Sequence, residues 1–348
     1  MSIDIPPSGR RQCEPYDTGA VQSGRFEEVG TSNMDTKTLG AGGPEISVIG
    51  FGAWEAGGDM WGPNESNDQV ISAIRAAIDA GMTWIDTAEV YGSGRSEELV
   101  GAAVKGHRDE VLLFTKWGPR EDGGSDEGGG PNVVRRAIRA SLGRLGTDHV
   151  DLYQIHWPPD GMPIEEAWGA MAQVQDEGLA RHIGVSNFDR GLIERCLPIR
   201  HVDSVQNQFS LLRQDDRAEL LPWLDENGIG YLAYGPLAFG LLTGAITRDS
   251  AFHARDWRSG GMRMSYYDRL FAPGKLEPNL EKVERLKAVA ERLGTTAATV
   301  ALRWALEQPG VTAGIAGSRN QDHVRSNAQA GDLKLESELL KELKGIFG

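Results

Sequence analysis

The chain has 348 residues, enough for one large domain or for two domains of the usual ~150 residues. Its 36 Lys and Arg residues against 50 Asp and Glu residues give a formal net charge of −14 at pH 7, so neither nucleic acid nor an anionic membrane is expected as a partner. Cys13 and Cys196 are the only cysteines, which excludes a disulfide scaffold or a cysteine-rich metal site and favours the reducing cytoplasm.

The first part of the chain differs from the rest. Residues 1–33 carry scattered charges without apolar periodicity, so we expect a disordered N-terminal tail. The chain lacks the basic and apolar regions of a secretory signal, and it has no apolar run of the ~18 residues that a membrane-spanning helix needs. Residues 34–348 are patterned throughout and are expected to form one domain.

Short apolar runs alternate with amphipathic stretches along this domain. Each run has the length of a strand, and each stretch has the i, i+3, i+4 apolar spacing of a helix. The apolar runs cover 46–52, 83–88, 111–117, 150–157, 182–188, 204–210, 230–237 and 312–318. The helical patterns cover 67–79, 96–105, 132–144, 163–178, 189–197, 216–227, 278–293 and 297–308.

Strands that alternate with helices predict βαβ units and a parallel sheet. Eight such units favour an α/β fold in which the sheet closes as a (β/α)₈ TIM barrel. The interval between the last two strands is longer than the others and holds an insertion at 238–275, which we expect to be a lid or a binding loop. An extra C-terminal helix is predicted at 335–345, on the outside of the barrel.

Polar residues occur where successive predicted strands end, which is where a TIM barrel carries its active site. Asp86, Lys116 and His156 end the second, third and fourth runs, and Tyr91 follows Asp86 by five residues. A phenol is a weak acid with a pKa of ~10, and a nearby ammonium lowers that pKa by stabilising the phenolate. A carboxylate would hold the ammonium, and an imidazole would orient a carbonyl oxygen. Together these groups predict general acid–base chemistry on a carbonyl.

Each of these residues also has an ordinary structural interpretation: a helix cap for Asp86, a solvated charge for Lys116 and a core histidine for His156. Their common position at successive strand ends favours catalysis. The remaining histidines show no metal-ligand spacing, so no metal site is expected. Neither a GxGxxG fingerprint after the first strand nor a GxxxxGK[ST] loop is present.

The motifs in chain order resemble those of the aldo-keto reductase superfamily. They are WIDTAEVYGSGRSEELVGAAV, LLFTKWG, DLYQIHW, HIGVSNF, SVQNQFSLL, YLAYGPLAFGLLTG and GIAGSRNQDHVRSN. The chain is most similar to the bacterial general aldo/keto reductases and the potassium-channel β-subunit-like branch, from about Asp35 to Gly331. The resemblance implies a barrel that binds NADPH rather than NADH, with Asp86, Tyr91, Lys116 and His156 as the catalytic tetrad.

The same resemblance implies the cofactor-binding residues. Ser186, Asn187 and Gln206 would bind the nicotinamide carboxamide, and Tyr234 would stack on the ring. Pro236, Leu237, Gly240, Leu242 and Thr243 would form the loop over the pyrophosphate, where glycine allows close backbone approach. Gly317, Ser318 and Arg319 would bind the 2′-phosphate at a helix N-terminus, and Asn327 would reach the adenine.

Departures from the family pattern occur at the phosphate end. Several relatives carry Lys where Gly317 stands, Arg or Gln where His323 stands, and Glu where Ser326 stands. The Lys that often follows LTG is Ala245 here. Recognition of the 2′-phosphate therefore depends on Arg319, with Arg325 as a second candidate.

Four tryptophans at or just beyond strand ends are expected to wall the substrate pocket: Trp54, Trp61, Trp117 and Trp157. Such walls suit an apolar or aromatic aldehyde, or a sugar. The function predicted is NADPH-dependent reduction of a small carbonyl substrate to an alcohol. The alternative is an NADP(H)-binding regulatory subunit that senses redox state with little turnover. A hydrolase using Asp86 and Glu89 would leave Tyr91 and Lys116 unexplained.

Overall fold

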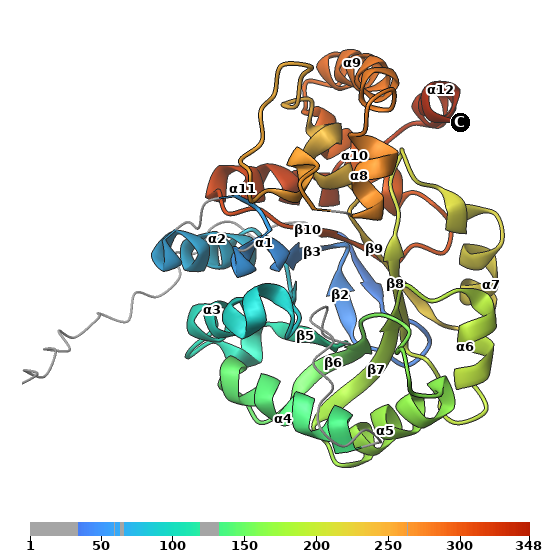
Figure 1. The fold of residues 1–348 in the computed structure, drawn as a ribbon. Coiled ribbons are helices and arrows are strands. Elements are labelled where there is room, and N and C mark those ends of the chain that lie inside the picture. The colour runs from blue at the N-terminus through green and yellow to red at the C-terminus, as the bar shows by residue number, and fades with distance from the viewer. Residues whose placement is uncertain (1–33, 59, 63–65, 119–131, 263) are drawn as a thin grey trace, which may run out of the picture. The chain divides into compact units, whose positions relative to one another are not determined.

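The computed structural model describes residues 34–58, 60–62, 66–118, 132–262 and 264–348. The tail predicted over residues 1–33 lies outside the described residues. The eight barrel strands close into one parallel ring in the order β10, β3, β4, β5, β6, β7, β8, β9. Figure 1 shows the helices arranged around this ring. The predicted (β/α)₈ barrel is confirmed.

The barrel strands fall within, or within two residues of, the predicted apolar runs. They are β3 (Ile49–Gly52), β4 (Trp84–Asp86), β5 (Leu112–Trp117), β6 (Val150–Ile155), β7 (Ala180–Ser186), β8 (Ser204–Gln208), β9 (Gly230–Tyr234) and β10 (Ala313–Ala316). The helices are α1 (Trp54–Gly57), α2 (Asn67–Asp79), α3 (Arg95–Ala103), α4 (Asn132–Leu145), α5 (Ile164–Asp176), α6 (Arg190–Cys196), α7 (Leu220–Glu226), α8 (Ser265–Leu270), α9 (Leu276–Arg292), α10 (Ala297–Leu306), α11 (Gln321–Ala328) and α12 (Ser337–Phe347).

The first predicted strand, 46–52, is divided in two. Its first part, β2 (Glu45–Ser47), pairs antiparallel with β1 (Thr36–Thr38) and stays outside the barrel ring. Leu39 and Ile46 from this hairpin are fully buried with interior barrel residues that include Trp84. The hairpin therefore closes the end of the barrel where the strands begin, and the polar strand ends lie at the opposite, open end.

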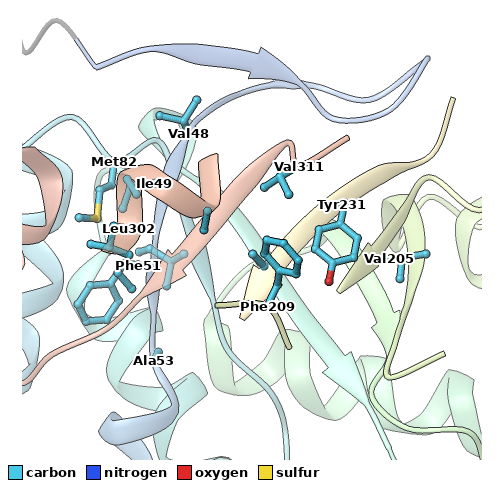
Figure 2. Close-up of a cluster of buried hydrophobic side chains, with 14 of the residues drawn as sticks. Val48, Ile49, Phe51, Ala53, Met82, Val205, Phe209, Tyr231, Leu302 and Val311 are labelled. Carbon is cyan, nitrogen blue, oxygen red and sulfur yellow. The ribbon is translucent and has the colours of Figure 1, made fainter. Parts of the chain in front are cut away.

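Side chains alternate between the inside and the outside of the ring. On β3, Gly50 and Gly52 face the interior, where a Cβ at Gly50 would come within 2.1 Å of the Trp84 ring. Ile49 and Phe51 point outward and lie near Leu302 of α10 (Figure 2). This alternation with period 2 separates the small barrel interior from the larger core beneath the helices.

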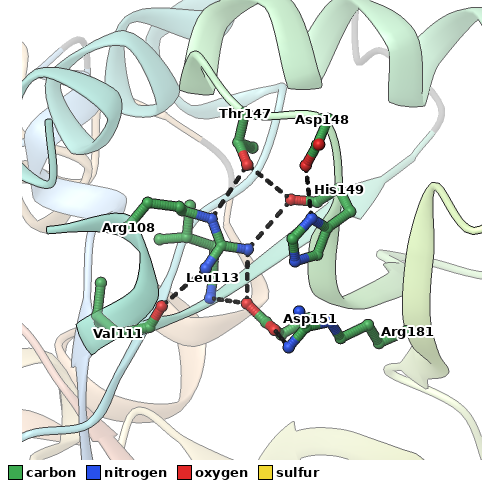
Figure 3. A network of polar contacts seen from close by, with 8 residues as sticks. All are labelled: Arg108, Val111, Leu113, Thr147, Asp148, His149, Asp151 and Arg181. Carbon is green, nitrogen blue, oxygen red and sulfur yellow. Dashed lines mark hydrogen bonds and ion pairs between the residues drawn. The ribbon is translucent and has the colours of Figure 1, made fainter. Parts of the chain in front are cut away.

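A buried charge network joins three strands near their starting ends (Figure 3). The Asp151 carboxylate accepts hydrogen bonds from Arg108 at 2.8 Å, from the Leu113 backbone N–H at 2.9 Å and from Arg181 at 3.1 Å. Asp151 is only 1% exposed, so the two guanidinium groups compensate its charge. The network fixes β5, β6 and β7 relative to one another.

The insertion, residues 238–275, is packed against the barrel rather than extended into solvent. It contains two short 3₁₀ helices, Ala238–Thr243 and Trp257–Ser259, followed by α8. Trp257, Tyr266 and Phe271 from this segment are buried. A segment with this many buried aromatic rings forms part of the core on the open side of the barrel.

The hairpin generates a stability prediction. Ile46→Ala should lower the free energy of unfolding by about 2–5 kcal/mol, because it leaves a cavity at the closed end of the barrel. Thr38→Ala, on the exposed part of the same hairpin, should change it by less than about 0.5 kcal/mol. Urea unfolding followed by circular dichroism measures both variants. An equal loss in the two variants would show that the hairpin does not close the barrel core.

Candidate active site

The centre of the site is a buried ion pair at the ends of β4 and β5. The Lys116 ammonium is fully buried and lies 2.5 Å from Asp86 Oδ1, and it donates a second hydrogen bond to the Thr87 carbonyl at 2.9 Å. The other oxygen, Asp86 Oδ2, accepts a hydrogen bond from Gln206 Nε2 at 2.8 Å. Both carboxylate oxygens are therefore engaged, and the ammonium is held in one position.

Tyr91 lies directly over this pair. Its hydroxyl is 3.5 Å from Lys116 Nζ, at the limit of a hydrogen bond. The backbone turns sharply after Tyr91, at Gly92, which has a φ of +60°. A Cβ at this position would lie 2.4 Å from the carbonyl oxygen of Gly57, so the turn needs glycine. Arg95 also donates to the Ala56 carbonyl at 2.6 Å, so α1 and the Tyr91 turn are fastened together. Only glycine fits this approach.

His156 completes the group at the end of β6. Its ring meets the Tyr91 ring edge to face, with centroids 5.5 Å apart and planes at 82°. The ring of Trp157 stacks on the other side of His156 at 6.5 Å. The structure thus brings Asp86, Tyr91, Lys116 and His156 together at the open end of the barrel.

The protonation states follow from burial. Burial and the nearby Asp86 carboxylate raise the pKa of Tyr91 well above its ordinary value. Burial and the charge of Lys116 lower the pKa of His156 well below its ordinary value, so the imidazole is neutral. Burial lowers the pKa of Lys116, and Asp86 opposes that shift.

The direction for Tyr91 corrects the sequence-based expectation of a lowered pKa. One ammonium at 3.5 Å, itself neutralised by Asp86, does not offset the removal of water from a phenolate. The phenol therefore stays protonated, which is the form that donates a proton.

A cavity of about 1050 Å³ opens above this group. Lys116 lies beneath the cavity floor. The tetrad residues Asp86, Tyr91 and His156 line the cavity, as do the following predicted residues: Trp54, Trp61, Trp157, Ser186, Asn187, Gln206, Tyr234, Pro236, Leu237, Gly240, Thr243, Gly317, Ser318, Arg319 and Asn327.

Two predicted residues do not line the cavity. Trp117 follows Lys116 on β5, so it points to the opposite face of the strand and packs in the outer hydrophobic core. Leu242 is fully buried in the same core. The structure therefore does not bring Trp117 or Leu242 to the cavity with the other predicted residues.

The residues predicted around the nicotinamide form a connected hydrogen-bond network. Asn187, in the left-handed region with a φ of +62°, donates through Nδ2 to the His156 carbonyl at 2.9 Å and to Ser186 Oγ at 3.1 Å. Its Oδ1 accepts from the Tyr234 hydroxyl at 2.7 Å. Ser186 Oγ donates to the Gln206 carbonyl at 2.7 Å. These side chains are fixed by one another.

The predicted phosphate end lies between β10 and α11. Gly317 packs against the Gly52 carbonyl so closely that a Cβ would lie 2.1 Å from it, which explains why Lys is absent at this position. Arg319 donates to the Trp61 carbonyl at 3.1 Å, and Asn320 caps α11 through its Oδ1. Arg319 lines the cavity beside the end of β10.

Comparison with known proteins identifies the family. Residues 48–347 match the model of the aldo/keto reductase family. The chain belongs to the aldo/keto reductase family. The resemblance found in the sequence motifs is thereby confirmed, and the protein is an oxidoreductase of this family.

Three relatives cover most of the chain. Aldo-keto reductase YhdN of Bacillus subtilis (strain 168) is 35% identical over 90% of this chain and 94% of the relative. The NADH-specific methylglyoxal reductase of Escherichia coli (strain K12) is 32% identical over 88% and 97%. A probable voltage-gated potassium channel subunit beta of Arabidopsis thaliana is 32% identical over 86% and 92%.

Solved structures agree with this assignment. The glycerol dehydrogenase AKR11B4 from Gluconobacter oxydans superimposes with a TM-score of 0.79 at 30% identity, covering 91% of this chain and 95% of that chain. An aldo-keto reductase from Klebsiella pneumoniae in complex with NADPH superimposes with a TM-score of 0.70 at 30% identity, covering 90% and 96%.

The structure of this family member adds residues that the sequence motifs missed. Glu55, Phe239, Arg258, Met264 and Tyr266 all line the cavity. The last four belong to the insertion. Phe239 lies within the motif YLAYGPLAFGLLTG, whereas Arg258, Met264 and Tyr266 lie in the part of the insertion that carries no motif. Their side chains reach the cavity because the insertion folds back over it. Arg258, which could have been a solvated charge, instead pairs with Asp256 at 2.7 Å and lies 4.9 Å from the Trp61 ring.

Two negative findings concern the described residues only. Within the described ranges, no group of three or more His, Cys, Asp or Glu side chains is placed to hold a metal ion. None of the helices in the described part of the chain is long and apolar enough to cross a membrane.

The lowered pKa of His156 predicts a pH effect on stability. Below a pH of ~6.5 the unfolded chain binds a proton at this residue that the folded chain does not, so stability is lost as the pH falls. Between pH 7.5 and 5.5, the wild type should lose about 1.4 kcal/mol more of its free energy of unfolding than His156→Gln does. Urea unfolding at the two pH values measures this difference.

The matched control is His201→Gln, at an exposed histidine. It should keep the pH dependence of the wild type. If His156→Gln also keeps the full pH dependence, the imidazole is not held neutral in the folded protein.

Proposed function

We propose that the protein reduces a small carbonyl substrate to an alcohol with NADPH, and that Tyr91 donates the proton. The observation that carries this proposal is the position of the Tyr91 hydroxyl, 3.5 Å from the ammonium of the buried Lys116–Asp86 pair. Tyr91 and His156 both line the cavity. A protonated phenol beside a fixed cation is the arrangement that general acid catalysis requires.

The cavity fits a dinucleotide in its length and in its chemistry. It extends from Tyr91 and His156 to Arg319 and Asn327, so it reaches from the strand ends to the start of α11. Ser186, Asn187, Gln206 and Tyr234 would hold the nicotinamide end. Pro236, Leu237, Gly240 and Thr243 would lie along the pyrophosphate. Gly317, Ser318, Arg319 and Asn327 would hold the adenosine end, where a helix N-terminus and a guanidinium favour a phosphate.

When bound, the reduced nicotinamide supplies the hydride that the carbonyl carbon receives. Tyr91 gives its proton to the carbonyl oxygen in the same reduction. The Lys116 ammonium stabilises the phenolate that this transfer leaves, and Asp86 together with the Thr87 carbonyl keeps the ammonium in place. The neutral His156 imidazole can donate an N–H to the carbonyl oxygen and orient it toward Tyr91.

NADPH is the proposed cofactor rather than NADH because the Arg319 guanidinium lines the cavity. The relatives differ in cofactor: two solved structures are described with NADPH or NADP, and one relative is described as NADH-specific. A guanidinium can bind the 2′-phosphate of NADPH, which NADH lacks.

The proposed substrate is an apolar or aromatic aldehyde, or a sugar that stacks on a ring. Trp54, whose ring lies 6.2 Å from that of Tyr91, and the 43% exposed Trp157 stand on two sides of the tetrad. Trp61 meets Trp54 edge to face at 4.9 Å and extends the wall. Flat apolar walls around a small polar centre favour such ligands.

Tyr91→Phe tests the proton donor. It should lower kcat at least about 100-fold and leave the Kd for NADPH unchanged, because it removes only the hydroxyl. NADPH consumption with a panel of aldehydes and sugars measures the first value, and NADPH fluorescence titration measures the second. A variant that keeps more than a tenth of the wild-type kcat has its proton donor elsewhere.

The same assay separates the alternative function. One relative is described as a potassium channel subunit beta, which favours a cofactor-binding regulatory subunit as the second candidate. Wild-type protein that binds NADPH tightly and turns over none of the panel would support that candidate over the reductase.

Arg319→Ala tests the cofactor preference. It should raise the Kd for NADPH by about 10- to 100-fold, the effect of losing a charge-assisted hydrogen bond, and the Kd for NADH far less. Arg325→Ala is the control, because Arg325, the second candidate from the sequence, is exposed on α11, pairs with Asp322 and does not line the cavity. Equal weakening of both nucleotides by Arg319→Ala would mean that Arg319 does not recognise the 2′-phosphate.

A further inference from the structure

A tyrosine of the insertion is hydrogen-bonded to the residues proposed to hold the nicotinamide. Tyr266 lies on α8, is 7% exposed and lines the cavity. Its hydroxyl oxygen is 2.9 Å from the hydroxyl oxygen of Tyr234 on β9. The Phe239 ring packs against Tyr266 with centroids 4.7 Å apart, and the Trp257 ring packs against it at 6.0 Å. Its position over the cavity is therefore fixed by aromatic packing as well as by the hydrogen bond.

The direction of this hydrogen bond follows from its neighbours. The Asn187 amide uses its Nδ2 to donate to the His156 carbonyl and to Ser186, so its Oδ1 is the end that faces Tyr234. An amide oxygen can only accept a hydrogen bond, so the Tyr234 hydroxyl donates its single hydrogen to Asn187 Oδ1. Tyr234 must then accept from Tyr266. The three side chains form a directed series in which Tyr266 donates to Tyr234 and Tyr234 donates to Asn187.

This series links the insertion to the strand ends of the barrel. It starts at Tyr266 on α8, continues through Tyr234 on β9 and ends at Asn187, whose amide donates a hydrogen bond to the His156 carbonyl. Tyr266 and the residues Asp86, Tyr91 and His156 line the same cavity. Each side chain in the series limits the rotation of the next.

We propose that Tyr266 is a positioning residue for the nicotinamide ring: by donating to Tyr234 it fixes the Tyr234 ring and the orientation of the Asn187 amide. This inference rests on the proposed NADPH-dependent function. Loss of the Tyr266 hydroxyl frees the Tyr234 hydroxyl to turn and weakens the hold on Asn187. The nicotinamide end of the cofactor is then bound less tightly, whereas the adenosine end is unaffected.

Tyr266→Phe tests the proposal with two nucleotides. The Kd for NADPH, from fluorescence titration, should rise about 3- to 10-fold, the effect of one hydrogen bond between neutral groups. The Kd for adenosine 2′,5′-bisphosphate, from calorimetry, should not change, because this probe lacks the nicotinamide. Tyr267→Phe is the matched control: it is the next residue on α8, and its hydroxyl makes no hydrogen bond within the described part of the chain.

A double variant separates a connected series from two independent contacts. If the hydrogen bonds act in series, Tyr234→Phe already removes the effect of Tyr266, and Tyr234→Phe/Tyr266→Phe should bind NADPH as Tyr234→Phe does. If the two effects on the Kd instead multiply, Tyr266 does not act through Tyr234 and the proposal fails.

The remaining outcomes are also decisive. Equal weakening of NADPH and the bisphosphate by Tyr266→Phe would show that the hydroxyl only supports the fold of the insertion, against the proposal. Unchanged binding of both, with a wild type that binds NADPH, would overturn this inference and leave the proposed function intact. A wild type that binds neither nucleotide would overturn the proposed function itself.

Discussion

The ion pair between Lys116 and Asp86 is the constraint on which the site depends. An ammonium that is fully buried needs a fixed opposite charge, and leaving a buried charge unpaired costs about 3–5 kcal/mol. Asp86 meets this need with one oxygen and binds Gln206 with the other, so β4, β5 and β8 are joined at their ends. Tyr91 lies over this joint, and its hydroxyl can face only the cation or the cavity. The same burial that makes the pair rigid also keeps the phenol protonated.

The barrel and the insertion make different contributions to the cavity. The barrel supplies Asp86 and Lys116 from the ends of β4 and β5, and Tyr91 and His156 from the segments that follow β4 and β6. The insertion supplies Phe239, Tyr266 and the Arg258 guanidinium to the cavity lining. The buried Trp257 ring packs against Phe239 and Tyr266, and Arg258 lies over Trp61. In this arrangement the barrel strand ends hold the groups proposed for catalysis, and the insertion shapes the space in which a substrate would bind.

Alternation along the strands explains which predicted residues the structure brings to the cavity and which it does not. Lys116 and Trp117 are adjacent in the sequence, yet one points to the interior beneath the cavity and the other packs under the helices. Reading strand ends without assigning faces placed both residues in the site. Gly317 illustrates the opposite case, because its departure from the family pattern is explained by the Gly52 carbonyl, which leaves no space for a side chain.

The sequence by itself determined the barrel and the family, because strand and helix periodicity and the motifs at strand ends are local properties of the chain. It also placed Asp86, Lys116 and His156 at the ends of successive strands. It could not determine the division of the first apolar run into a hairpin strand and a barrel strand, since the run is continuous in the sequence and its two parts are distinguished by their pairing partners. The raised pKa of Tyr91 also required the tertiary structure, because burial outweighs the nearby cation. The same holds for the place of Tyr266 beside Tyr234, 32 residues away in the chain, because only the folding of the insertion brings the two hydroxyls together.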